Sequence, residues 1–380
     1  MKIGIITFWQ SNDNYGQLLQ CWAMQQVLKG MGHEPFLIRY NYHEYYDDAP
    51  LWKRVARIIL ILPYFKRQKL KRKKINYKIK NACREFDKFR EEHLIKSEQY
   101  YFSPDILKQN PPEADVYITG SDQVWAQLLG NKRVLPSFLD FGPDSTRRIS
   151  YAPSFARKVY PAKLERQLRE ALSRFDAISV RERDGVNICK KVGYDAVHVI
   201  DPTLLLDKSK YIKLITAKST ISGYIYIYSI NIADASEVRW SEIRAYSQRL
   251  GLSIIVTPGS GYFEGKELFG DEVTYDYSTI HQWLSNIANA KMLVTTSFHG
   301  TVFSLILHCP VIYVPLKGHF ASGNNRAEEL LRNVGLENRI LSDNVNIEAC
   351  FVNKIDWAAV DARLSIMRIH SLEFLNKSLI

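Results

Sequence analysis

The sequence predicts an α/β protein of two doubly wound, Rossmann-like domains that face each other across a cleft. Apolar runs of strand length alternate with helical patterns, as in βαβ units. A second series of alternation starts near residue 224, and at 380 residues the chain exceeds the size at which a single core usually stops growing. A composition of 46% hydrophobic and 24% charged residues is typical of a globular protein.

The N-terminal series opens with the clearest βαβ unit. Residues 2–8 predict a strand, residues 9–16 a loop, and residues 17–32 a helix that ends at Gly30 and Gly32. Further strands are predicted at 35–40, 115–120, 148–153, 177–182 and 197–202. Their nearly continuous apolarity indicates burial on both faces, which is typical of a parallel sheet.

The second series predicts strands at 224–230, 253–259, 291–298 and 310–316. We therefore expect an N-terminal domain over 1–208, a C-terminal domain over 209–350 and a helical segment over 351–380. Open α/β sheets bind ligands at the carboxyl ends of their strands. Functional residues are therefore expected in the loops that follow the strands.

The net charge of +11 is concentrated in one insertion, residues 51–90, which holds 15 Lys and Arg against two acids. Its apolar centre at 58–62 is too short to span a bilayer but suits the plane of an anionic membrane surface. A solvated basic helix is the alternative. Nucleic acid is not expected as a partner, because no nucleic-acid-binding fold accompanies the basic run.

The cysteines and the first residues point to the cytoplasm. Five cysteines lie far apart without a CxxC pair, which argues against a disulfide framework and against a thiolate metal site. Residues 1–9 have the character of a first strand rather than of a signal peptide.

Two loops of the N-terminal domain gather polar residues after a strand. The loop at 11–16 opens a helix and can offer side chains and backbone N–H groups to an anion, although such residues also build turns and caps. The loop at 120–125 follows a buried strand, and one of its residues can cap the next helix. The candidate residues are Asn14, Tyr15, Gly16, Ser121, Asp122 and Gln123.

Arg181 emerges from the strand predicted at 177–182. At the carboxyl end of a strand, a guanidinium can grip a carboxylate or phosphate with two parallel hydrogen bonds. A structural ion pair with Asp201 is the alternative, and the two interpretations stay open on the sequence alone.

His299 stands between the strand predicted at 291–298 and an apolar helix. A histidine can transfer protons near neutral pH, and the amino terminus of a helix favours negative charge. A buried histidine satisfied within the core is the alternative. Its small or polar neighbours Ser297, Gly300 and Thr301 favour the functional interpretation.

In their order along the chain, these stretches resemble the polysaccharide pyruvyl transferase family. The resemblance covers residue 1 to about residue 340, and it is carried by residues 8–34, 118–125, 149–155, 179–185, 201–206 and 295–306. It implies a fold like that of GT-B glycosyltransferases. It also implies transfer of pyruvate from phosphoenolpyruvate to a sugar of a bacterial surface polysaccharide or of its precursor, commonly as a cyclic ketal.

The resemblance implies a role for each candidate. His299 becomes the general acid or base, the N-terminal loops contact the acceptor sugar, and neither a metal nor a cofactor is expected beyond phosphoenolpyruvate as co-substrate. The implied donor-binding residues are Arg181, Ser297, Gly300, Thr301 and Arg326. Several family members carry Arg-Leu-His where this chain has Ser297-Phe298-His299, so another cation, Arg326 or one near Lys317, has to supply that arginine's contribution.

Surface polysaccharides are often built on polyprenyl diphosphate carriers at the cytoplasmic face of the membrane. A basic insertion that binds this surface would bring the enzyme to such an acceptor. We expect a cytoplasmic protein bound peripherally to the inner face of the cytoplasmic membrane. Two rival functions share the predicted fold. One is a GT-B glycosyltransferase or sugar-nucleotide epimerase, and the other is a non-catalytic carbohydrate-binding protein.

Neutralising the cations from Lys71 to Lys74 with glutamine tests the membrane prediction. Each cation near an anionic surface contributes about 1 kcal/mol, so we expect binding to anionic vesicles to weaken at least ~tenfold in a co-sedimentation assay. Turnover of a soluble acceptor should not change. A variant with four lysines neutralised outside residues 51–90 is the control, and unchanged vesicle binding by the first variant would contradict the prediction.

Overall fold

The computed structural model describes residues 1–42, 82–215, 223–259, 267–342 and 345–380. These residues form two five-stranded sheets in which every neighbouring pair of strands is parallel. The predicted α/β fold class is therefore confirmed. Most of the basic insertion lies outside the described residues.

The N-terminal sheet has the strand order β3-β2-β1-β4-β5. Its strands are β1 (Lys2–Ile6), β2 (Glu34–Tyr40), β3 (Lys96–Tyr101), β4 (Val116–Thr119) and β5 (Arg147–Ser150). β1 lies in the middle and is buried from its second residue onward. Strand β3 was not predicted, because its sequence KSEQYY alternates polar residues along an edge and lacks an apolar run.

The C-terminal sheet repeats this arrangement with the order β10-β9-β8-β11-β12. Its strands are β8 (Tyr224–Ser229), β9 (Ser253–Pro258), β10 (Thr274–Tyr275), β11 (Met292–Thr295) and β12 (Val311–Tyr313). The two-residue edge strand β10 was also missed. In both sheets the chain crosses from the middle strand to each edge, as doubly wound folds do.

Two of the predicted strands lie outside the two five-stranded sheets. β6 (Ser179–Val180) and β7 (Val197–His198) pair only with each other within the described chain, in a separate two-stranded sheet. A single bridge between Ile149 and Ala177 joins the neighbouring backbone to β5. The apolar pattern therefore identified these strands correctly but not the sheet to which they belong.

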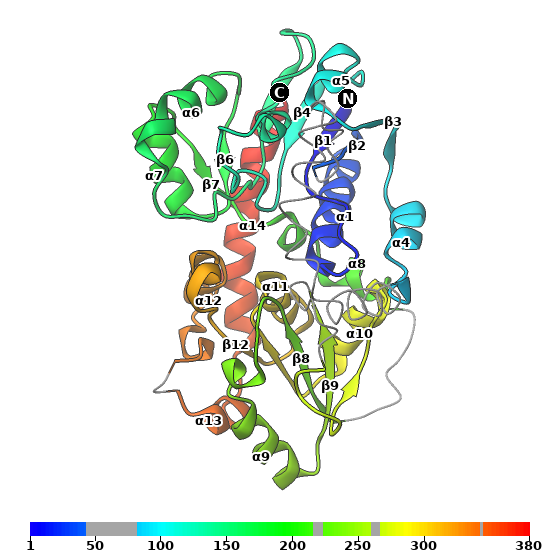
Figure 1. Ribbon diagram of the computed structural model, residues 1–380, viewed down its shortest axis with the longest axis vertical. Helices are drawn as coiled ribbons and strands as arrows, with labels where there is room; N and C mark the ends of the chain where they lie inside the picture. Colours follow the sequence, from blue (N-terminus) through cyan, green and yellow to red (C-terminus); the bar gives the residue numbers. More distant parts are fainter. Residues whose placement is uncertain (43–81, 216–222, 260–266, 343–344) are drawn as a thin grey trace, which may run out of the picture.

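Helices cover the sheets, as Figure 1 shows. The longer ones are α1 (Tyr15–Gly30), α4 (Phe86–His93), α6 (Glu165–Leu172), α7 (Arg183–Lys191), α9 (Trp240–Leu250), α10 (Ile280–Asn289), α11 (Phe298–Leu307), α12 (Asn325–Asn333) and α14 (Trp357–Leu379). The shorter helices α5 (Pro104–Gln109), α8 (Lys208–Ile212) and α13 (Ile347–Val352) connect them. No helix among the described residues is long and apolar enough to cross a membrane.

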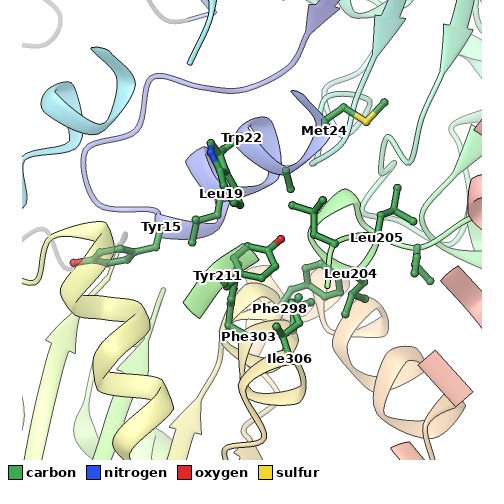
Figure 2. Close-up of a cluster of buried hydrophobic side chains, with 14 of the residues drawn as sticks. Tyr15, Leu19, Trp22, Met24, Leu204, Leu205, Tyr211, Phe298, Phe303 and Ile306 are labelled. Atoms are coloured by element: carbon green, nitrogen blue, oxygen red, sulfur yellow. The ribbon is translucent and has the colours of Figure 1, made fainter. Parts of the chain in front are cut away.

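The two sheets share one continuous hydrophobic core. Figure 2 shows its middle, where α1 lies opposite α11 and Tyr211 of α8 lies between them. The Tyr211 ring is 5.5 Å from that of Trp22 and 5.1 Å from that of Phe303. Tyr15 stacks on Trp283 of α10 with ring centroids 5.0 Å apart. Aromatic contacts therefore hold the two halves together.

Helix α14 runs along both halves of the molecule (Figure 1). At its start, Trp357 stacks on His308 at the end of α11, with ring centroids 4.8 Å apart. Near its end, Ser378 accepts a hydrogen bond from Arg147 of β5 at 2.7 Å. The helix thus returns the chain to the N-terminal sheet, while the domain limits after 208 and 350 stay predictions.

Truncating Phe303 to alanine tests the shared core. The side chain is fully buried between the two halves, so we expect the free energy of unfolding to fall by about 3–5 kcal/mol in urea denaturation. Ile369 of α14 is 56% exposed, and Ile369→Ala is the matched control with little expected loss. Similar losses in both variants would contradict the assignment.

Candidate active site

His299 lies where strand β11 gives way to helix α11, as the sequence predicted. Ser297 caps the helix, since its side-chain oxygen accepts a hydrogen bond from the Gly300 amide at 3.3 Å. The imidazole is buried, with 5% of the residue exposed. The strand and the cap therefore fix the place of the ring.

Asp201 forms the centre of the site. Its Oδ1 accepts hydrogen bonds from the amide and the hydroxyl of Thr203, at 3.1 and 2.7 Å. Its Oδ2 accepts from the Ser121 hydroxyl at 2.9 Å and from Arg181 Nη1 at 2.8 Å. His299 Nε2 lies 3.5 Å from the same oxygen, within ion-pair distance. We call these five residues the Asp201 cluster.

The charge of Asp201 depends on these partners. Burial by itself would raise the pKa of the carboxyl. The charges of His299 and Arg181, together with the hydrogen bond from Thr203, outweigh burial and hold the pKa well below its usual range. Asp201 is therefore a carboxylate at neutral pH, able to orient the imidazole and to stabilise its protonated form.

Gly16 packs directly against His299. A Cβ atom built on Gly16 would lie 2.0 Å from His299 Cγ and 2.1 Å from Nδ1, closer than any side chain allows. Gly16 is in the first turn of α1, after strand β1. The first turns of α1 and α11, which follow strands of different sheets, thus meet at the imidazole, and only glycine permits their contact.

Arg181 forms the structural ion pair with Asp201 that remained open from the sequence. Its guanidinium also lies 3.2 Å from Glu182 and 3.8 Å from Asp122, and it stacks over the Phe298 ring. Burial opposes the charge, but the three carboxylates outweigh it and raise the pKa of the guanidinium. A direct grip on the donor, as predicted for Arg181, does not fit a cation already enclosed by three acids.

Arg326 has a different environment. It lies over the same Phe298 ring, and both of its terminal nitrogens donate to the side-chain oxygen of Gln123, at 2.7 and 2.6 Å, when the amide is oriented to satisfy both groups. Burial and the nearby charge of Arg181 lower the pKa of Arg326. Within the described part of the chain, no carboxylate forms an ion pair with it. Arg326 is therefore the cation of this site that an anionic ligand can neutralise.

The other residues predicted for the donor are already engaged at the helix start. The Gly300 amide donates to the Ser297 side chain, and the Thr301 amide and hydroxyl donate to the Ser297 carbonyl. A Cβ on Gly300 would lie 2.4 Å from the Thr295 hydroxyl, so this glycine allows the helix to approach its strand rather than a ligand.

The residues predicted for the acceptor separate into two groups. Ser121, Asp122 and Gln123 lie within or beside the Asp201 cluster. Asn14 caps α1 by accepting from the Gln17 amide at 3.2 Å. Tyr15 is fully buried, and its hydroxyl donates to the Ser278 carbonyl at 2.7 Å. The structure thus places Tyr15 in the core, where its side chain does not face an acceptor.

Sequence reasoning missed the central role of Asp201 and the position of Phe298. Asp201 was considered only as a partner of Arg181, although an acidic residue in the loop that follows a strand, here three positions after β7, is itself a signal of a site. Phe298 carried no such signal, because an aromatic residue next to an apolar helix usually belongs to the core.

The cluster has the parts of a proton-transfer site. A buried carboxylate faces Nε2 of a buried histidine, an arrangement that is typical of acid–base pairs. Arg326, which has no carboxylate partner in the described chain, lies over the same Phe298 ring as Arg181 of the cluster. Such a site suits acid–base chemistry on an anionic substrate.

The family model described as polysaccharide pyruvyl transferase matches residues 14–317. No curated protein sequence matches the chain.

Solved structures of similar fold include two UDP-N-acetylglucosamine 2-epimerases. The one from Methanocaldococcus jannaschii, in complex with UDP-GlcNAc and UDP, has 12% identity and a TM-score of 0.54, over 97% of this chain and 99% of that one. The one from Rickettsia bellii has 10% identity and a TM-score of 0.54, over 99% and 95%. At such identities the likeness shows the fold alone, and it confirms the predicted GT-B-like arrangement.

Replacing Asp201 by asparagine tests the centre of the cluster. The change leaves the buried guanidinium of Arg181 without the nearest of its three carboxylates, so we expect the free energy of unfolding to fall by about 3–5 kcal/mol at pH 7. Because the folded pKa of Asp201 is lowered, its contribution is present above its usual value near 3.8 and is lost as the pH falls below it.

The difference in urea stability between wild type and Asp201→Asn should therefore stay constant from pH 7 to 5 and shrink below pH 4. The exposed Asp195, changed to asparagine, is the control. A difference that grows on acidification would exclude the proposed charge state.

Proposed function

The chain belongs to the polysaccharide pyruvyl transferase family, and we propose that it moves pyruvate from phosphoenolpyruvate to a sugar of a bacterial surface polysaccharide or of its lipid-linked precursor, forming a cyclic ketal and releasing phosphate. The observation that carries the proposal is the buried pair of Asp201 and His299 at the contact between the two halves. An acid–base pair at that place suits a reaction between a donor and an acceptor.

The proposed reaction needs a proton before it needs a nucleophile. The enol carbon of phosphoenolpyruvate gains a proton and becomes a methyl group, which leaves the neighbouring carbon oxocarbenium-like. A sugar hydroxyl oxygen bonds to that carbon, the bond to the phosphate oxygen breaks, and a second hydroxyl oxygen closes the ring. Of the two hydroxyl protons, one replaces the proton spent on the enol carbon and the other leaves with phosphate.

His299 supplies this proton and recovers one from the sugar. Its Nε2 faces Asp201, so Nδ1 is the nitrogen that exchanges protons with the substrate. Asp201 stabilises the protonated ring before the transfer and fixes its orientation. Gly16 lies against this side of the ring, where a Cβ atom would be only 2.1 Å from Nδ1, so a larger residue at position 16 would displace the imidazole.

Arg326 binds the carboxylate or the phosphate of the donor. It takes the role that the missing arginine at position 297 has in several family members, and Gln123 aligns its guanidinium. Arg181 is a positioning residue in this scheme, because it holds Asp201 and Phe298 rather than the donor. Ser297, Gly300 and Thr301 act indirectly by fixing the start of α11.

The acceptor enters from the side of the N-terminal sheet. Gln123 and Asn14 are its polar contacts, since Ser121 is held by Asp201 and Asp122 forms an ion pair with Arg181. A polyprenyl-diphosphate-linked acceptor would bring the enzyme to the inner face of the cytoplasmic membrane. The basic insertion at 51–90 is our proposed contact with that surface.

A sugar-nucleotide enzyme is the main rival, because the similar structures include epimerases. Their likeness extends to the fold alone, whereas the family model covers residues 14–317 of this chain. A carbohydrate-binding protein without catalysis is the second rival. A buried aspartate within ion-pair distance of a buried histidine is unusual for a site that only binds neutral sugars.

The direct test is incubation of the protein with phosphoenolpyruvate and a panel of lipid-linked sugars, read by mass spectrometry for a pyruvyl ketal and by phosphate release. We expect His299→Ala to lower the rate by about 10² to 10⁴ while phosphoenolpyruvate still binds, because only proton transfer is lost. The exposed His370 on α14, changed to alanine, is the matched control.

Two outcomes would overturn the proposal. Glycan binding without any ketal on any acceptor would favour the binding protein. Thermal stabilisation by a nucleoside diphosphate sugar, but not by phosphoenolpyruvate, would favour an epimerase or a glycosyltransferase.

A further inference from the structure

We propose that Glu92, His93 and His281 form a binding site for a divalent transition-metal ion, of which Zn²⁺ is the type case, between helices α4 and α10. Each residue offers one ligand atom, and these atoms all lie within 4.8 Å of one another. Neither helix contributes to the Asp201 cluster. The site is therefore separate from the proposed chemistry, for which no metal was expected.

The spacing suits a single ion after a small adjustment of side chains. Zinc binds histidine nitrogen at about 2.0–2.1 Å and carboxylate oxygen at about 2.0–2.2 Å, which brings its ligands within about 4 Å of each other. His93 Nε2 already lies 3.9 Å from Glu92 Oε2. Both residues stand at the carboxyl end of α4, where Glu92 is exposed and free to rotate toward the ion.

His281 has the hydrogen bond that is typical of a metal ligand. Its Nδ1 donates to the backbone carbonyl of Leu214 at 2.6 Å. This bond fixes the tautomer with the proton on Nδ1, so Nε2 presents a lone pair. Metal-binding histidines commonly use a backbone carbonyl in this way, both to orient the ring and to raise its basicity.

The surroundings hold the two imidazoles near each other. The rings of His93 and His281 have centroids 5.4 Å apart at an interplanar angle of 58°, and Phe89 contacts both. Both histidines are only partly buried, so an ion can reach them from solvent. The aromatic neighbour limits the rotation of the rings, which lowers the ordering cost of binding.

The ligand types select the class of ion. Two imidazoles and one carboxylate suit Zn²⁺ and its transition-metal neighbours, whereas Ca²⁺ and Mg²⁺ prefer oxygen ligands alone. Three protein ligands leave the fourth tetrahedral position to water.

The position of the site indicates a structural effect, because α4 precedes β3 of the first sheet and α10 precedes β11 of the second. A bound ion would link the two halves.

The test uses the full chain without a polyhistidine tag, freed of metal with a chelator and titrated with Zn²⁺ alone. We expect one equivalent to bind in isothermal titration calorimetry. At a concentration 100 times the Kd, the melting temperature should rise by about 3 °C. Ca²⁺ and Mg²⁺ at the same concentration should have no effect.

Variants separate this site from adventitious binding. Glu92→Gln changes an exposed side chain with little risk to folding, and we expect at least ~tenfold weaker Zn²⁺ binding from it, with a larger loss from His281→Ala. His370→Ala on α14 should bind like the wild type. Absence of a one-equivalent site, or equal affinity in wild type and Glu92→Gln, would overturn the proposal. Loss of binding in His370→Ala with retention in His281→Ala would do the same.

Discussion

The structure around the site depends on one buried negative charge. Asp201 is 1% exposed, and such a carboxylate is tolerable only when hydrogen bonds and cations replace the water that it has lost. Its partners Ser121, Arg181 and His299 come from two loops and a helix start that are far apart in the chain. The need to satisfy Asp201 therefore fixes how these loops meet, and the same contacts give the imidazole a defined orientation.

The shared core makes this arrangement rigid. Tyr15, Tyr211 and Trp283 belong to three helices. Tyr15 stacks on Trp283, and the Phe303 ring contacts both Trp283 and Tyr211, so these rings form a connected set between the two sheets. Gly16 follows Tyr15 directly, so the residue that anchors α1 in the core also places its neighbour against His299. The same few residues therefore determine both how the two halves pack and how His299 is surrounded.

Much of the fold could be predicted because its central strands are continuous apolar runs. Such runs can be identified from the local sequence alone, without knowledge of which strands they pair with. The edge strand β3 and the small sheet of β6 and β7 were not, since pairing is decided by tertiary contacts. The same limit applies to the site. His299 and Arg181 were proposed as site residues from their places after strands, but nothing local showed that three acids surround Arg181 or that Gly16 touches the imidazole.

Helix α14 also has a consequence for the order in which the chain completes its structure. Ile200, after strand β7, donates its backbone amide to Ser371, and Arg147 of β5 donates to the carbonyl of Ser378. These contacts join residues separated by 171 and 231 positions, so their loop-closure cost is high and they form late. During synthesis, the surface of the first half that α14 covers stays open to solvent until the second half has left the ribosome. The N-terminal half is thus synthesised before the second half, but α14 covers its surface only after the second half has been made.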